Sequence, residues 1–182
     1  KEARELMTAS KNLLKPADGA PILHIEQDIV LGCYYLTYDK PGVTTDEVVP
    51  ISDLNEAIMA LESDKVKLQT KIRTTFRGQR METTTGRLIF NSIFPEDFPY
   101  QDDTMTKKKL ASVMGKVFAQ YGDEKTATIA DELMRIGFSY ATFAGISTSM
   151  DDYLDLEGLD KLIDAGENKA TAVSDQFEQG LI

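Results

Sequence analysis

The run from Gln27 to Tyr38 is apolar almost all round, and it constrains the fold more than any other feature of the chain. An element that lacks a polar face is covered on every side, so we expect this one to be buried. Its periodicity does not decide between a helix and a strand. Cys33, the only cysteine, lies in the run, so no internal disulfide can form and we expect a buried, inert thiol.

Two segments that flank this run have the spacing of helices. Residues 3–14 carry leucines at helical intervals and end at Pro16, which predicts a first helix. Ser52 is a good N-cap, and the apolar residues that follow it predict another helix over 52–62.

Three more core elements are predicted in the second half of the chain. Leu88 to Phe94 is apolar apart from two residues, and its type is left open between helix and strand. Thr106 can cap a helix that extends to Gly122. Another helix runs over about 124–136, and we expect Gly137 to stop it. These two helices should pack as an antiparallel pair.

A β-hairpin is predicted over 65–85. Charged and apolar residues alternate over 65–73, as in a strand with one exposed and one buried face. Arg77-Gly78-Gln79 offers a turn, and Arg80 to Thr85 return as the second strand. This basic face is a candidate for contact with nucleic acid, nucleotides or an acidic partner, although an ordinary solvated strand face explains it as well. The outer residues are Lys65, Lys67, Lys71 and Arg73.

The last predicted helix, over about 158–179, has a narrow apolar stripe on an otherwise acidic surface. Such a stripe needs a partner helix, and none remains in the given sequence. We therefore expect a tail that is mobile, dimerises or packs in a non-native way. The stripe residues that could dock a protein factor are Leu159, Leu162, Ile163 and Phe177.

Composition excludes several functions for the chain by itself. A net charge of −10 argues against non-specific binding of nucleic acid. A single cysteine and a single histidine, His24, cannot make a structural zinc site. The pairs Asp102-Asp103 and Asp151-Asp152 are adjacent carboxylates, which usually diverge, so we interpret them as solvated loops and not as magnesium ligands. No apolar run is long enough to span a bilayer, and we expect a soluble cytoplasmic protein.

Four blocks carry a family resemblance in their family order. They are Gln27–Thr37 (QDIVLGCYYLT, preceded by NLLKPADG), Thr83–Pro95 (TTTGRLIFNSIFP), Ile136–Thr142 (IGFSYAT, followed by GIS and DD), and Gln176–Ile182 (QFEQGLI). Together they resemble the largest subunit (β′) of bacterial DNA-directed RNA polymerase, in the region that follows its catalytic aspartate loop. Where that family commonly has an arginine after the third block, this chain has Phe143, so no role of that arginine is carried over.

The resemblance implies a fold and a place in a larger enzyme. It favours a helix for the buried run and an α+β fold, mostly helical, with a β-hairpin. Residues 1–152 would form the pore domain, and 153–182 the first arm of a coiled coil at the rim of the secondary channel. Because the sequence opens at Lys1 without an initiator methionine, we expect an excised portion of a longer protein.

The family's activity is template-directed synthesis of RNA, so the resemblance implies a nucleotidyltransferase of which this chain is an inactive piece. No cofactor is expected in the chain, whereas Mg²⁺ and Zn²⁺ are implied for the whole subunit. Implied partners are the β, α and ω subunits, template DNA, RNA, nucleoside triphosphates and regulatory factors of the secondary channel, with no membrane. The competing hypothesis is a free-standing acidic domain that recruits a helical partner.

Three residues are candidates for the wall of the nucleotide channel. Gln27 and Asp28 open the first block, where they either cap the following element or face the pore near the reacting nucleotide. Arg87, in the second block, makes a salt bridge or helix-end contact, or contacts a phosphate or a neighbouring subunit.

Overall fold

The apolar run forms helix α2 (Gln27–Thr37), as the resemblance favoured. It is not covered on every side as expected, because Tyr34 is 39% exposed. Gly32, Cys33, Leu36 and Thr37 are all buried on it. A Cβ atom on Gly32 would overlap the carbonyl oxygen of Gly137, so the backbones of two helices touch at this point. Glycine is required where two backbones approach so closely.

Gly137 belongs to α5 (Lys107–Ala144), which packs along α2 and does not stop at that glycine. The prediction that Gly137 ends the helix is therefore wrong. The helix ends instead at Gly145, which takes the left-handed conformation typical of a C-terminal cap (φ 59°).

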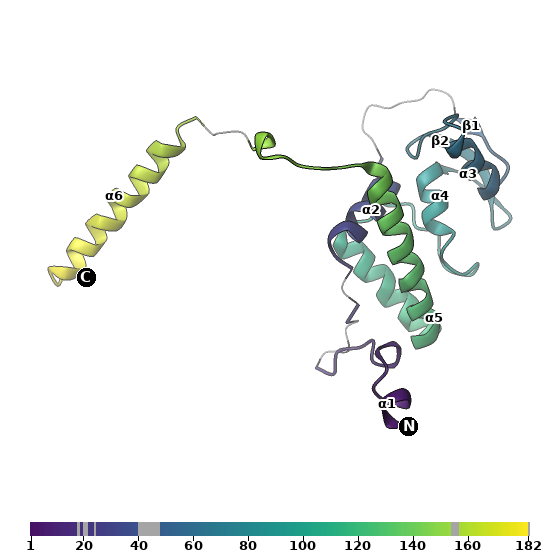
Figure 1. The fold of residues 1–182 in the computed structure, drawn as a ribbon, viewed down its shortest axis with the longest axis horizontal. Helices are drawn as coiled ribbons and strands as arrows, with labels where there is room; N and C mark the ends of the chain where they lie inside the picture. Colours follow the sequence, from purple (N-terminus) through teal and green to yellow (C-terminus); the bar gives the residue numbers. More distant parts are fainter. Residues whose placement is uncertain (18, 20–21, 24, 40–47, 154–156, 182) are drawn as a thin grey trace. The chain divides into compact units, whose positions relative to one another are not determined.

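Helix α5 consists of two helical segments that meet at Gly122, whose φ of 74° and ψ of −170° are not helical. Thr106 accepts a hydrogen bond from the Lys109 amide and caps the first segment, as predicted. Figure 1 shows the chain turning back at the break, so that the two segments form the predicted antiparallel pair. Both segments contribute to one hydrophobic core, the first through Val113 and Val117 and the second through Leu133.

The described part of the chain covers residues 1–17, 19, 22–23, 25–39, 48–153 and 157–181 of this computed structural model. It divides into two compact units, Lys1–Ile146 and Ser147–Ile182, and the domain boundary at 152 stays a prediction. None of the described helices combines the length and the apolar character needed to cross a membrane.

The predicted helix over 52–62 is α3 (Leu54–Glu62), but its cap is Asp53 and not Ser52. The Asp53 carboxylate accepts a hydrogen bond from the Glu56 amide at 2.9 Å. In return, the Glu56 side chain accepts from the Ser52 amide at 2.6 Å. The prediction was therefore off by one residue, because both residue types are good caps and only the reciprocal bonds decide between them.

The single helix expected over 3–14 is replaced by a short α1 (Glu2–Glu5) and a 3₁₀ turn (Ala9–Lys11). Neither piece has a buried residue. A helix without an apolar face against a core is only marginally stable, which explains why the helical spacing did not give one continuous helix.

The sheet of the described residues consists of β1 (Val49–Pro50), β2 (Lys71–Phe76) and β3 (Gln79–Thr84), in the order β1-β2-β3. Strand β1 is parallel to β2, and β2 and β3 form an antiparallel hairpin. The turn lies where it was predicted but is one residue shorter, because Gln79 already belongs to β3. Arg77 and Gly78 both have positive φ (49° and 78°), as a two-residue hairpin requires.

The strand begins later than predicted. Residues 65–70 form turns below α3, where the Lys65 and Val66 amides both donate to the carbonyl oxygen of Ala60. Val66 and Leu68 are buried there without strand pairing, so alternation was mistaken for a strand. Lys65 and Lys67 therefore do not share a strand face with Lys71 and Arg73.

The core element left open between helix and strand is a helix, α4 (Thr85–Asn91), which packs against α2 and α3. A Cβ atom on Gly86 would overlap the carbonyl oxygen of Leu36, so α2 meets a second glycine here. Helix makes up 57% of the structure beside this small mixed sheet, which confirms the α+β class.

The second unit contains a 3₁₀ turn (Met150–Asp152) and the helix α6 (Leu159–Glu178). Ser149 and Asp152 form a reciprocal capping box at the turn. Helix α6 confirms the helix predicted over 158–179, and it has no buried residue.

Replacing Gly32 by alanine should lower the free energy of unfolding by about 2 kcal/mol or more, because the new methyl group has to push the backbones of α2 and α5 apart. The midpoint of urea unfolding, followed by circular dichroism, measures the change. The matched control is Gly115→Ala in α5, where a Cβ meets nothing within 4 Å and alanine should be neutral or slightly stabilising. Equal midpoints for the two variants would contradict the close crossing.

Candidate functional site around Arg87

Arg87 joins three parts of the first unit. Its Nε donates to the carbonyl oxygen of Thr37, the last residue of α2, at 3.2 Å. Its Nη1 lies 3.2 Å from the Asp102 carboxylate, and its Nη2 lies 3.9 Å from that of Asp39. Its side chain is only 12% exposed. The structure therefore makes both the salt bridge and the helix-end contact that the sequence suggested.

Thr37 completes this junction from the other side. Its hydroxyl donates to the Cys33 carbonyl at 2.8 Å and accepts from the Met105 amide at 2.8 Å. Its carbonyl oxygen also accepts from the Thr104 hydroxyl at 3.4 Å. Sequence reasoning missed Thr37, although a threonine within an apolar run is the kind of buried polar residue that needs partners.

A surface pocket of about 220 Å³ opens beside the Arg87 guanidinium. Of the four basic residues proposed to contact a partner (Lys65, Lys67, Lys71 and Arg73), only Lys71 lines this pocket together with Arg87. Asp39, Glu82 and Asp102 also line it, so its charge is mixed and negative on balance. A free phosphate is a poor fit for such a pocket, because two cations face three carboxylates.

The other basic residues of the hairpin region are separated from one another. Arg73 pairs with Glu82 on the neighbouring strand at 2.7 Å, and both side chains are well exposed. Lys65 and Lys67 lie in the turns before β2 and are exposed. The continuous basic face expected on one strand is therefore not formed.

Gln27 and Asp28 are exposed in the first turn of α2. Gln27 takes a left-handed backbone conformation (φ 51°), and the N-cap residue Glu26 makes no capping hydrogen bond through its side chain. Glu26 instead pairs with Lys107 at 2.5 Å, which ties the start of α2 to the start of α5. A carboxylate at Asp28 is favourable beside the positive end of the helix dipole.

Arg77 and Asn91 hold the loop that follows α4, and neither was singled out from the sequence. Arg77 donates to the carbonyl oxygens of Asn91, Phe94 and Phe98 at 2.7–3.1 Å. The buried Asn91 side chain pairs with the backbone of Gln101 through two hydrogen bonds, of 2.7 and 2.9 Å. An asparagine within an apolar segment was the available signal for the second residue.

The paired carboxylates make local contacts with neighbouring residues. Asp103 pairs with Lys109 at 3.1 Å, and Asp152 accepts from the Ser149 amide at 2.7 Å. Within the described residues, no group of three or more histidine, cysteine, aspartate or glutamate side chains could hold a metal ion. His24 lies outside the described residues.

Cys33 is fully buried, as predicted, and burial raises the pKa of its thiol to about 12. It is therefore protonated at neutral pH and inert as a nucleophile.

The apolar stripe of α6 is exposed along its length. The proposed docking residues Leu159, Leu162, Ile163 and Phe177 have exposed fractions between 46% and 74%. Among the described residues of the second unit, none buries any part of α6 enough for a residue there to count as buried.

Replacing Arg87 by lysine should lower the free energy of unfolding by about 1–3 kcal/mol, because the hydrogen bond to Thr37 is lost from a nearly buried position. The matched control is Arg73→Lys, whose exposed ion pair should be worth under about 1 kcal/mol. Urea unfolding of both variants measures the difference. Equal losses would show that the junction does not depend on the guanidinium.

The sequence model of the family described as RNA polymerase Rpb1, domain 3, matches residues 12–153. All 182 residues align with a DNA-directed RNA polymerase subunit beta' from Desulforudis audaxviator at 36% identity, and with one from Bdellovibrio bacteriovorus at 38%. The subunit from Thermobifida fusca is 34% identical. The chain spans 13–16% of the length of these three relatives. It belongs to the RNA polymerase Rpb1 domain 3 family.

Proposed function

We propose that this chain is a segment of the β′ subunit of a bacterial DNA-directed RNA polymerase and takes part in transcription. The observation that carries the proposal is the alignment of the whole chain with β′ subunits at 34–38% identity. Its partners would then be the β, α and ω subunits, the DNA template, the RNA product and nucleoside triphosphates, in the cytoplasm.

The metal ions of such an enzyme would be held by other parts of the subunit. Within the described residues, no three carboxylates come together as magnesium ligands, and the single cysteine is buried among apolar residues. The residues present therefore do not fit a magnesium or a zinc site, and no chemical step is assigned to them. We expect the isolated chain to have no polymerase activity.

The finer role that we propose is a wall of the channel through which nucleoside triphosphates enter and the RNA 3′ end is extruded. Gln27 and Asp28 support this role, because both are exposed at the start of a helix that the core holds firmly. The Arg87 guanidinium contacts Thr37 and Asp102 within the chain. Its proposed role is therefore to hold the C-terminal end of α2 in place.

The exposed stripe of α6 supports a second role, the docking of regulatory factors beside the channel. Its apolar residues are presented on an acidic helix, which suits a helical partner. The same stripe is the one observation that favours the alternative of an acidic interaction domain.

Replacing Gln27 and Asp28 by alanine in the full-length parent subunit should raise the apparent KM for nucleoside triphosphates about threefold or more, with a smaller change in kcat. The reason is that residues which guide or hold the entering nucleotide contribute to binding before chemistry. Steady-state elongation by the assembled polymerase, measured against nucleotide concentration, separates the two constants.

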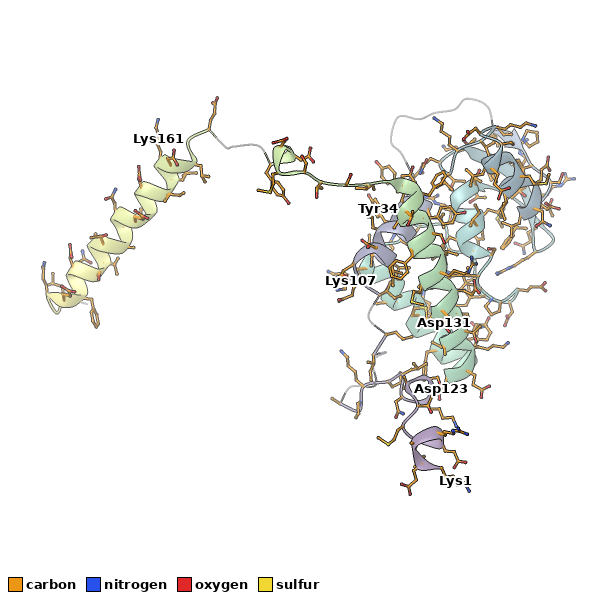
Figure 2. The ribbon with its side chains drawn as sticks, viewed as in Figure 1. Lys1, Tyr34, Lys107, Asp123, Asp131 and Lys161 are labelled. Atoms are coloured by element: carbon orange, nitrogen blue, oxygen red, sulfur yellow. The ribbon has the colours of Figure 1, made fainter. Side chains whose placement is uncertain are left out.

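The matched control is Asp131→Asn, an exposed carboxylate on α5 that Figure 2 labels. It should leave both constants unchanged. If the double variant behaves like this control in elongation and in cleavage of backtracked RNA, these residues do not line the channel.

A further inference from the structure

A small pocket lies at the tip of the β2-β3 hairpin, away from the Arg87 junction. It has a volume of about 220 Å³, which is less than the 300 Å³ or so of the smallest ordinary ligand pockets. It is therefore suited to a single side chain and too small for a nucleotide. One cation and one carboxylate are among its lining residues, which are Phe76, Arg77, Gln79, Met81, Glu96, Phe98, Pro99 and Tyr100.

Three aromatic side chains line this pocket. Phe76 and Tyr100 meet edge to face, with ring centroids 5.8 Å apart, and both are half-buried. Phe98, which is 3% exposed, also lines the pocket. Rings arranged in this way offer both flat faces and an apolar surface to the stem of an entering side chain.

Most of the polar groups around the pocket are already engaged. The Tyr100 hydroxyl is hydrogen-bonded to the Thr83 hydroxyl at 2.6 Å. The Arg77 guanidinium donates to three carbonyl oxygens at the end of α4 and in the loop beyond, where the negative end of the helix dipole offsets its charge. Glu96 is different, because it is exposed and forms no ion pair within the described chain.

We propose that this pocket receives an arginine side chain from a protein partner. The guanidinium would stack on the aromatic wall and pair with the Glu96 carboxylate, while its aliphatic stem lies against Met81. One face of the Phe76 ring is already occupied by a guanidinium, since the Cζ atom of Arg77 lies 4.7 Å from its ring centroid, so the entering group would stack on Tyr100. Arginine suits the pocket better than lysine, because its planar group both stacks on rings and binds carboxylates in a bidentate manner.

The proposal is independent of the polymerase assignment, because it concerns only the chemistry of the hairpin tip. It is tested by titrating the ¹⁵N-labelled chain with N-acetyl-arginine methylamide and following backbone amide shifts by NMR. We expect saturable shifts at Phe76, Gln79 and Tyr100. Glu96→Gln should weaken the binding about threefold, the scale of one exposed ion pair.

Two comparisons make the titration decisive. Glu124→Gln removes another exposed carboxylate, on α5, and should leave the arginine affinity unchanged. The lysine and leucine analogues should bind more weakly than the arginine analogue. The proposal is overturned if no shifts appear at the hairpin tip, if Glu96→Gln has no effect, or if the leucine analogue binds equally well.

Discussion

The rest of the first unit depends on how closely α2 approaches its neighbours. Gly32 and Gly137 bring the backbones of α2 and α5 into contact, and Gly86 brings α4 against the carbonyl oxygen of Leu36. A helix held at backbone contact on two sides cannot slide or rotate without a clash. Its exposed start, at Gln27, and its junction with Arg87 are therefore fixed relative to the same core.

The sequence could predict this helix but not its packing. Apolar character on all sides indicated burial of α2, and the resemblance indicated a helix. Gly137 was read as a helix stop because glycine can end a helix or allow two helices to cross, and only the partner across the contact decides. Likewise, the burial of Val66 and Leu68 has the period of a strand although the backbone there forms turns.

The candidate site was only partly accessible from the sequence, for a related reason. Arg87 could be found because it lies in a block with a family resemblance. Thr37 also lies in such a block, but its contacts and those of Arg77 could not be predicted, because their partners are backbone groups distant in the sequence, such as the amide of Met105 and the carbonyl of Phe98. A hydrogen bond from a side chain to a backbone atom can be made with almost any residue type. The partner residue therefore cannot be identified from the sequence.

The electrostatics of the first unit favour a supporting and docking role over direct handling of phosphates. Arg73 and Arg87 both pair with carboxylates, and Lys107 and Lys109 do the same at the start of α5. Lysines in the first turn of a helix oppose its dipole, and their acidic partners offset that cost. A phosphate would have to displace these partners in a chain whose net charge is −10. The chain's own contribution is therefore better sought in the rigid placement of α2 and in surfaces that accept protein side chains.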